Sequence, residues 1–373
     1  MEGILMKTPK GIIVSIVVVI LGFLVVYSQT GLPEKKEGHE AAAAGYGGGG
    51  GLARAPMPRL AFISLPGDEG VIPAGANMQI LASADDVEKN ARSWIVVDCR
   101  DRESYNEGHI PSAIHLGETC NDFFRGDLEV KTQGLFKNLG MRPVEELERK
   151  LGAAGLSMDK TIVFYDGKMG NPTVGKSYGI LAGYAFVPFW FMEYLGHQDV
   201  RVLDGGIMAW VAVDKPLETK DNRLGSTVFK ANVMKNRLAT TEELARAGSD
   251  PNVQIVDTRT PAEYAGTSAT PPNHFLEGKI AQAGHAAGVD LVAPHFYQFV
   301  DMETLKLRPV WQLKRIYASQ DMGKRTVAYC ILGNRSSMAY FVMRLLGFKD
   351  PANYHDSWFV YGNTDNVPVE KAL

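Results

Sequence analysis

Short hydrophobic runs alternate with longer, helix-like segments from about residue 75 to the end of the chain. The runs Ile95–Asp98 and Val253–Val256 are rich in valine and isoleucine, as is typical of buried strands. Stretches such as Ser83–Asp86 and Thr240–Glu243 combine a polar N-cap with an acidic first turn, so each indicates the start of a helix. Strands alternating with helices predict an α/β fold, in which small and mainly parallel sheets are flanked by helices.

This pattern occurs twice along the chain. Ile95–Arg100 followed by Tyr105 matches Val253–Arg259 followed by Tyr264, with the same Arg-to-Tyr spacing. Likewise, 161–166 matches 325–330, which places Asp166 where the second run has Cys330. We therefore predict two copies of one unit. They are called the first copy (75–217) and the second copy (238–373), with a linker at 218–237.

The first sixty residues have a different composition. Residues 11–27 carry no charge and consist mainly of Ile, Val and Leu, a length that approaches a bilayer core when helical. Lys7 and Lys10 precede this run, which favours a cytoplasmic N-terminus. We predict a cytoplasmic tail (1–10), a transmembrane signal anchor or signal peptide (11–32), and a flexible tether rich in Gly, Ala and Pro (33–74). A buried core helix is the alternative for the apolar run.

This organisation predicts the location of the two copies. With an uncleaved anchor, the protein is held in the inner membrane through residues 11–27, with both copies in the periplasm or otherwise outside the cytoplasm. If the segment is cleaved as a signal peptide, the protein is instead secreted or periplasmic. Since the net charge is −3 and the sequence has no basic stripe with interleaved aromatic residues, nucleic acid is not an expected partner.

The candidate chemistry centres on Cys330. It lies between an expected strand, Thr326–Tyr329, and an expected amphipathic helix, Ser336–Leu346. At such a turn the thiol faces the positive end of the helix dipole and unpaired backbone N–H groups, which lower a thiol pKa and hold anions. The turn therefore predicts a reactive thiol.

The run Cys330-Ile331-Leu332-Gly333-Asn334-Arg335 resembles the Cys-x-x-Gly-x-Arg loop of the rhodanese (sulfurtransferase) family. Asp257-Thr258-Arg259, Gly284-His285 and a tryptophan near the C-terminus occur in the order typical of that family. The similarity covers residues 75–373. It implies a tandem arrangement of two rhodanese-like domains, in which the first copy is inactive because Asp166 and Asn171 replace Cys330 and Arg335.

The resemblance implies a thiosulfate sulfurtransferase. Cys330 is the expected catalytic residue: it takes a sulfane sulfur from a small-molecule donor as a persulfide and passes it to a thiophilic acceptor such as cyanide, a thiol or a protein thiol. The expected anion cradle is Ile331, Leu332, Gly333, Asn334, Arg335 and Ser336. Related phosphatases have one residue more between the Cys and the Arg, so the loop length favours sulfur over phosphate chemistry.

Residues present in both copies are expected to be structural. Asp257 and Arg259 have counterparts in the copy without the thiol, so we expect a supporting ion pair or loop anchor. His109 and His285 are expected to be structural as well, because no further ligand lies at metal-binding spacing. No metal and no cofactor are therefore predicted.

Two questions stay open at this level. Thiosulfate enzymes often carry basic residues where this chain has Ile331, Leu332 and Glu263, which keeps an alternative function in view. The alternative is a non-enzymatic rhodanese-like protein that binds sulfur or selenium oxyanions or a redox partner. Cys99 and Cys120 could pair and leave Cys330 free, or Cys99 could be a small buried residue at a strand end.

Overall fold

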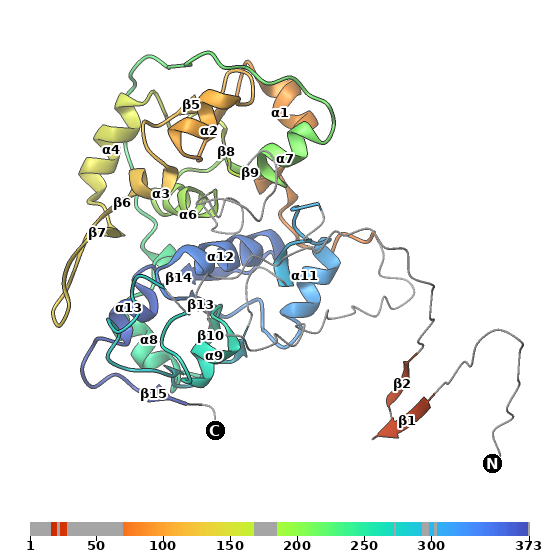
Figure 1. The fold of residues 1–373 in the computed structure, drawn as a ribbon, viewed down its shortest axis with the longest axis vertical. Helices are drawn as coiled ribbons and strands as arrows, with labels where there is room; N and C mark the ends of the chain where they lie inside the picture. Colours follow the sequence, from red (N-terminus) through yellow and green to blue (C-terminus); the bar gives the residue numbers. More distant parts are fainter. Residues whose placement is uncertain are drawn as a thin grey trace, which may run out of the picture. The chain divides into compact units, whose positions relative to one another are not determined.

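The computed structural model describes residues 16–20, 23–27, 70–167, 185–271, 274–292, 298–301 and 304–371 (Figure 1). The predicted cytoplasmic tail (1–10), nearly all of the predicted tether (33–74) and Asn171 lie outside the described residues. The chain divides into two units, Met1–Ala43 and Ala44–Leu373, and the second unit contains both copies.

The apolar segment near the N-terminus differs from the helix that we predicted over 11–32. Its described part consists of two strands, β1 (Ile16–Ile20) and β2 (Phe23–Tyr27), which pair antiparallel. Both strands are rich in β-branched residues, whose side chains favour extended backbone over helix. Within the described residues, no helix is both long and apolar enough to cross a membrane. Membrane attachment and location outside the cytoplasm remain predictions.

The first copy is built on a parallel sheet of five strands in the order β3-β9-β8-β4-β5. Val96 and Val163 point to one face and Val97 and Phe164 to the other, because successive side chains of a strand alternate. Both faces are apolar, as expected for a parallel sheet covered on two sides. The strands are β3 (Leu81–Ala82), β4 (Ile95–Asp98), β5 (Ile114–His115), β8 (Ile162–Tyr165) and β9 (Val200–Leu203).

Helices pack on both faces of this sheet. One apolar cluster joins the sheet to residues of α1 and α7, and another joins it to α3, α4 and α6. The helices are η1 (Met78–Ile80), α1 (Ala84–Asn90), α2 (Arg102–Glu107), α3 (Cys120–Phe124), α4 (Val144–Ala153), α6 (Phe186–Tyr194) and α7 (Gly206–Val211). An antiparallel hairpin, β6 (Arg125–Val130) and β7 (Gly134–Met141), follows α3 directly.

The second copy repeats this sheet. Its strand order is β14-β13-β10-β12, and a parallel bridge from Leu238 to Asn353 extends it on the β14 side, where β3 stands in the first copy. The central pairs β4/β8 and β10/β13 are both parallel. The shared order is what the sequence repeat predicts. The strands are β10 (Val253–Asp257), β12 (Leu291–Val292), β13 (Arg325–Tyr329) and β14 (Asp350–Asn353), and a separate pair is formed by β11 (His285–Ala286) and β15 (Val369–Glu370).

The helix after Cys330 differs from the amphipathic helix that we expected. It is α12 (Asn334–Leu346), and side chains around its whole circumference are buried. It packs against α6 of the first copy, and one apolar cluster runs through both copies (Figure 1). Glu193 of α6 accepts hydrogen bonds from Tyr340 at 2.5 Å and from Arg344 at 2.8 Å. The remaining helices are η2 (Lys235–Arg237), α8 (Thr241–Ala247), α9 (Pro261–Ala265), α11 (Val310–Ile316) and α13 (Ser357–Tyr361).

One buried ion pair recurs in both copies. In the second copy, Arg259 donates to Asp257 at 2.7 Å and to the Gly284 carbonyl at 2.7 Å, with both side chains of the pair fully buried. In the first copy, Arg100 bonds Asp98 at 2.6 Å and the Gly108 carbonyl at 2.7 Å. The pair thus ties the end of a central strand to the Gly-His turn, which is a structural task that both copies need.

The buried pair leads to a stability prediction. Asp257→Asn removes one charge and leaves Arg259 buried without its counterion, so we expect the free energy of unfolding to fall by about 3–5 kcal/mol. Urea denaturation followed by circular dichroism measures this change. Asp221→Asn, which alters an exposed pair with Arg223, is the control and should leave the curve close to wild type. Equal effects of both variants would contradict a structural role for the buried pair.

Candidate active site

The loop that holds Cys330 begins where β13 ends at Tyr329 and finishes where α12 begins at Asn334. Gly333 is the N-cap of α12 and has a φ of 80°, which favours glycine. A side chain at Gly333 would also meet the carbonyl oxygen of His355 at 2.5 Å. The loop is therefore curled tightly at the one position where the sequence supplies a glycine.

The sulfur of Cys330 is fully buried and lies among hydrogen-bond donors. The backbone N–H of Gly333 donates to Sγ at 3.0 Å, and the hydroxyl of Ser336 lies 3.6 Å from Sγ. Burial alone would raise the pKa of Cys330, but the charge of Arg335 and the N–H groups of Ser336 and Leu332 outweigh it and lower the pKa below the ordinary thiol value. Cys330 is also a free cysteine. The site therefore favours the thiolate.

Ser357 forms hydrogen bonds with the backbone of the loop. This role was not predicted from the sequence. Its hydroxyl accepts the N–H groups of Cys330 and Gly333, each at 3.1 Å, and donates to the Tyr354 carbonyl at 2.7 Å. Its Oγ is 3.8 Å from Sγ. Ser357 has a φ of 52°, a left-handed conformation that non-glycine residues rarely adopt. The available signal was its position directly before Trp358, a tryptophan near the C-terminus.

The first turn of α13 holds the loop as well. The N–H of Trp358 donates to the Cys330 carbonyl at 2.9 Å, and that of Phe359 donates to the Ile331 carbonyl at 3.0 Å. The N–H groups at the start of a helix have no partner within it, so they are available to the loop. The two carbonyls point toward α13.

The side chains of Ile331 and Leu332, which we predicted in the donor-binding cradle, lie in an apolar cluster, and their part in binding a donor stays a prediction. Their side chains are 5% and 8% exposed and pack with Val130, Leu276 and Phe359 in one apolar cluster. Residues of the β6–β7 hairpin join this cluster, and the Phe136 ring contacts Phe359 at a centroid distance of 4.8 Å. Their apolar character thus serves packing between the copies, because the hairpin excludes water from them.

Arg125, at the start of β6, brings a buried cation from the first copy to the loop. Its guanidinium donates to the Leu332 carbonyl at 2.6 Å and to the side-chain oxygen of Asn334. Arg125 is 1% exposed. Arg125 was not predicted from the sequence, because nothing in the residues around it indicates which loop its side chain contacts. Asn334 therefore links the loop to the first copy.

Arg335, the predicted cation for an anionic donor, is paired with a carboxylate, and its contact with a donor stays a prediction. Its two terminal nitrogens donate to the two carboxylate oxygens of Glu263, at 2.8 and 2.7 Å. Glu263 is fully buried, and the favourable charge of Arg335 outweighs burial and lowers the pKa of Glu263 to about 2. Glu263 is therefore ionised at neutral pH. Glu263, at a position where thiosulfate enzymes often carry a basic residue, is thus the counterion of Arg335.

The remaining predicted residues are placed as follows. Ser336 lies beside Sγ, whereas Ser337 donates to the Gly333 carbonyl at 2.7 Å and stabilises the turn. Asp257 and Arg259 form the buried pair described above. His109 and His285 each bond a backbone carbonyl, of Tyr105 and Tyr264, through Nδ1 at 2.8 Å. In the described part of the chain, no group of three or more His, Cys, Asp or Glu residues is arranged to hold a metal ion.

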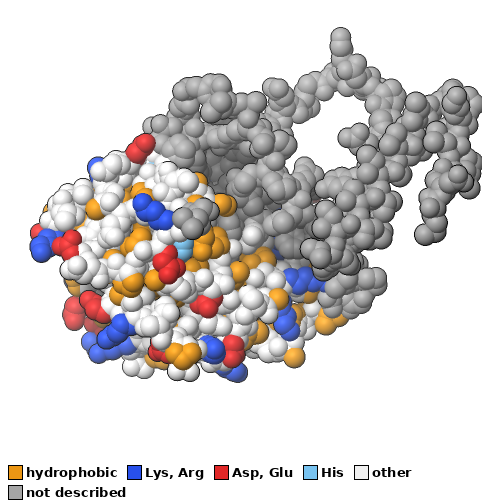
Figure 2. Space-filling model, turned by 90° about the horizontal axis from the view of Figure 1, so that it is seen from below, with side chains coloured by type: hydrophobic (Ala, Val, Ile, Leu, Met, Phe, Trp, Pro, Cys, Tyr) orange, Lys and Arg blue, Asp and Glu red, His pale blue; other side chains and the backbone are white. Residues whose placement is uncertain are grey.

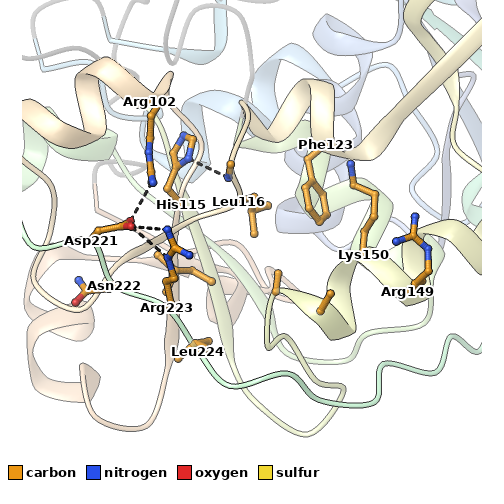
Figure 3. Close-up of a pocket in the computed structure, with 14 residues that line it drawn as sticks. Arg102, His115, Leu116, Phe123, Arg149, Lys150, Asp221, Asn222, Arg223 and Leu224 are labelled. Atoms are coloured by element: carbon orange, nitrogen blue, oxygen red, sulfur yellow. Dashed lines mark hydrogen bonds and ion pairs between the residues drawn. The ribbon is translucent and has the colours of Figure 1, made fainter.

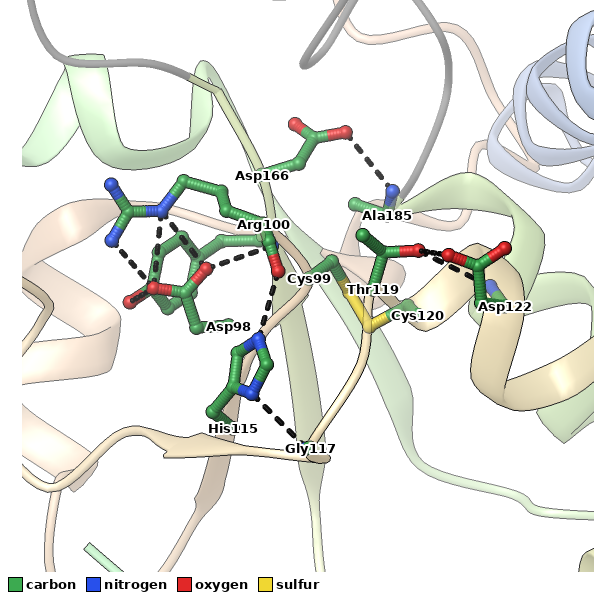
Figure 4. Close-up of a disulfide and its surroundings, with 11 residues drawn as sticks. Asp98, Cys99, Arg100, His115, Gly117, Thr119, Cys120, Asp122, Asp166 and Ala185 are labelled. Carbon is green, nitrogen blue, oxygen red and sulfur yellow. Dashed lines mark hydrogen bonds and ion pairs between the residues drawn. A yellow bond between two sulfur atoms is a disulfide. The ribbon is translucent and has the colours of Figure 1, made fainter. Parts of the chain in front are cut away.

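The first copy has a carboxylate at the place of the thiol. Asp166 follows β8 and accepts the N–H of Ala185 at 3.0 Å (Figure 4). Near it, Cys99 and Cys120 form a disulfide between the end of β4 and α3. The pairing that the sequence left open is thus present, and Cys330 is the thiol that remains.

A separate pocket of about 420 Å³ lies in the first copy and the linker (Figure 3). It is lined in part by Arg102, Arg149, Lys150 and Arg223, and Asp221 bonds both Arg102 and Arg223. No residue of the Cys330 loop lines it. Elsewhere, acidic and basic side chains are interspersed with apolar ones on the described part of the face in Figure 2.

The tandem arrangement is supported by comparison with known proteins. The model of the rhodanese-like domain matches residues 83–213 and 240–364. The chain belongs to the rhodanese-like family. The two matched ranges fall within the predicted first and second copies, and Cys330 lies in the second.

Relatives match this chain over nearly their whole length. A protein of Saccharopolyspora erythraea named "Putative thiosulfate sulfurtransferase" is 31% identical over 299 residues, covering 78% of this chain and 96% of that protein. A protein of the same name in Haloferax volcanii is 28% identical over 304 residues, covering 78% and 96%. These rhodanese relatives support sulfurtransferase activity at the level of the family.

Solved structures share the fold. The anaerobic ergothioneine biosynthesis enzyme from Chlorobium limicola, solved with trimethyl histidine, superposes with a TM-score of 0.66 at 23% identity, covering 79% of this chain and 71% of that one. The wild-type structure of EanB superposes with a TM-score of 0.67 at 22% identity, covering 81% and 72%. At this identity, the likeness concerns the fold.

The contacts of Arg125 lead to a prediction about Cys330. In Arg125→Gln the loop loses a charged donor at Leu332, so the N–H groups around Sγ are held less firmly. We expect the midpoint of the pH profile for Cys330 alkylation to rise by about one unit. Iodoacetamide labelling followed by mass spectrometry measures it. Arg142→Gln is the matched control, since Arg142 bonds Asp122, Phe123 and Glu146 rather than the loop. An unchanged midpoint in folded Arg125→Gln would refute the positioning role.

Proposed function

We propose that this protein is a sulfurtransferase that moves a sulfane sulfur from thiosulfate or a related donor to a thiophilic acceptor through a persulfide on Cys330. The observation that carries the proposal is the free Cys330 thiol, with its lowered pKa and the Gly333 N–H directed at Sγ. Membership of the rhodanese-like family supports it.

The reaction divides into two displacements at sulfur. The Cys330 thiolate attacks the outer sulfur of the donor, and the bond from that sulfur to the rest of the donor breaks. With thiosulfate, sulfite leaves and the persulfide stays on Cys330. An acceptor such as cyanide, a thiol or a protein thiol then attacks the outer sulfur of the persulfide and regenerates the thiolate.

The loop stabilises negative charge in both displacements. The N–H of Gly333 and the hydroxyl of Ser336 are directed at Sγ, and donors already in place need no reorganisation during the reaction. Ser357 holds the loop that supplies them, because its hydroxyl accepts the N–H groups of Cys330 and Gly333. Arg335 adds a positive charge whose effect is reduced by Glu263. The first copy contributes by holding the loop through Arg125 and the hairpin, without a thiol of its own.

A second candidate function is a non-enzymatic protein that binds a sulfur or selenium oxyanion or a redox partner at the same loop. The pairing of Arg335 with Glu263 and the buried position of Cys330 favour this alternative. It requires no persulfide, so the two functions differ in one measurable intermediate.

Mass spectrometry separates the two functions. After incubation with thiosulfate, mercaptopyruvate or glutathione persulfide, we expect intact protein to gain the mass of one sulfur, because the Cys330 thiolate accepts it. Cyanide should then remove the added sulfur as thiocyanate. Cys330→Ser should abolish both signals and serves as the control. If wild-type protein gains no sulfur from any of the three donors, the sulfurtransferase proposal fails.

We further propose that residues 11–27 attach the protein to a membrane, with both copies outside the cytoplasm. The support is the uncharged apolar run and the preceding Lys7 and Lys10. Carbonate extraction of membranes tests this: full-length protein should stay in the pellet, and a variant lacking residues 1–32 should be soluble. Release of the full-length protein would disprove an uncleaved anchor.

A further inference from the structure

The pair between Arg335 and Glu263 removes most of the positive charge expected beside Cys330. Both terminal nitrogens of Arg335 are engaged by one carboxylate, and the Arg335 side chain is only 11% exposed. A negative charge at Sγ therefore interacts with Arg335 and with its buried counterion, Glu263, at the same time. To an incoming anion, this pair acts as a dipole rather than as a cation.

Among the described residues, the charged side chains that contact the loop or the pair do not restore a cation for the donor. Arg259 is paired with Asp257, and Arg125 is directed at Leu332 and Asn334. His274 is near the pair; burial first, and then Arg335, lower its pKa to about 4, so it is neutral at pH 7. Burial keeps His355 neutral and raises the pKa of Asp356.

The comparison between the copies connects the pair to the thiol. Asp257–Arg259 has its counterpart in Asp98–Arg100, so that pair belongs to the scaffold. Glu263 and Arg335, in contrast, correspond to Ser104 and Asn171 in the copy where Asp166 replaces Cys330. Thiol, arginine and glutamate thus occur together in one copy, and all three are replaced in the other. The pair is therefore part of the sulfur site.

Resting on the proposed function, we infer that the preferred donor is a small-molecule persulfide of a thiol, R–S–SH, rather than the thiosulfate dianion. Thiolate and thiosulfate together bring three negative charges to a loop whose arginine is already neutralised. At the reacting sulfurs, a thiolate and a protonated persulfide bring one. Because Cys330 is fully buried and the next two loop residues, Ile331 and Leu332, pack in an apolar cluster, a small molecule suits the site better than a protein-bound persulfide.

In this transfer one S–S bond forms and another breaks. The Cys330 thiolate attacks the outer sulfur of R–S–SH, a new S–S bond forms to Sγ, and the S–S bond within the donor breaks. R–S⁻ leaves with the electron pair, and the persulfide proton stays on the transferred sulfur. The products are Cys330 persulfide and the thiolate R–S⁻, with a total charge of −1 before and after.

Phe275 offers a contact for the carbon part of such a donor. It is 58% exposed and its ring stacks on His274 at a centroid distance of 4.6 Å. The N–H of Leu276 donates to Nδ1 of His274 at 3.2 Å, and Leu276 packs with Ile331 and Leu332 of the loop, which places the stacked pair near the site. An exposed aromatic ring next to a neutralised arginine suits an organic group better than a sulfite group.

Donor preference of the wild-type protein is the first test. We expect the kcat/KM for loading Cys330 with glutathione persulfide to exceed that with thiosulfate by roughly tenfold or more. Equal loading by the two donors, or faster loading by thiosulfate, would overturn the donor inference and leave the proposed function standing. Absence of loading by these two donors and by mercaptopyruvate would instead refute the proposed function.

Glu263→Gln is the second test, because it releases the charge of Arg335 while keeping the size of the side chain. The kcat/KM for loading with thiosulfate should rise by roughly tenfold, so the ratio of the kcat/KM values of the two donors should shift toward thiosulfate. Glu243→Gln is the matched control: it removes a carboxylate from Arg325 of the same copy and should leave the ratio unchanged. An unchanged ratio in folded Glu263→Gln, checked by circular dichroism, would contradict the inference. If that variant does not fold, the wild-type ratio decides.

Discussion

A fully buried thiolate has to be stabilised by protein groups alone, and the second copy is organised around this constraint. Water cannot solvate Cys330, so N–H groups and hydroxyls are directed at Sγ or hold the loop that supplies them. Ser357 accepts two N–H groups of the loop, and α13 donates to two of its carbonyls. The loop thus has partners on both sides before any substrate arrives.

The same constraint explains why the copy without a thiol still matters. Removing water from the loop requires a cover, and the first copy provides it through the β6–β7 hairpin and Arg125. The shared apolar cluster and the contacts of Glu193 with α12 fix the two copies to one another at the helix that follows the loop. The first copy, in which Asp166 and Asn171 stand at the positions of Cys330 and Arg335, thus packs against the loop and positions it.

Sequence patterns predicted the parts of this protein that depend on local order. The repeat, the alternating strands and helices, the cap residues and the position of Cys330 all follow from spacing along the chain. Contacts between distant residues did not follow. Glu263 was read as a missing cation because its partner lies 72 positions away, and Arg125 reaches a carbonyl 207 positions away. The burial of α12 on all sides depends on the neighbouring copy, and the valine-rich N-terminal run suits strands as well as a helix.

The disulfide of the first copy bears on how the three cysteines are kept apart. Cys120 begins α3, and α3 leads directly into Arg125, so the bridge anchors the segment that reaches the Cys330 loop. Exchange between a thiol and a disulfide requires that the attacking sulfur reach its target. Once the chain has folded, Cys330 is enclosed and cannot compete for either partner. The buried position of the thiol thus protects the correct pairing, and one chain can hold an oxidised pair and a reactive reduced cysteine at the same time.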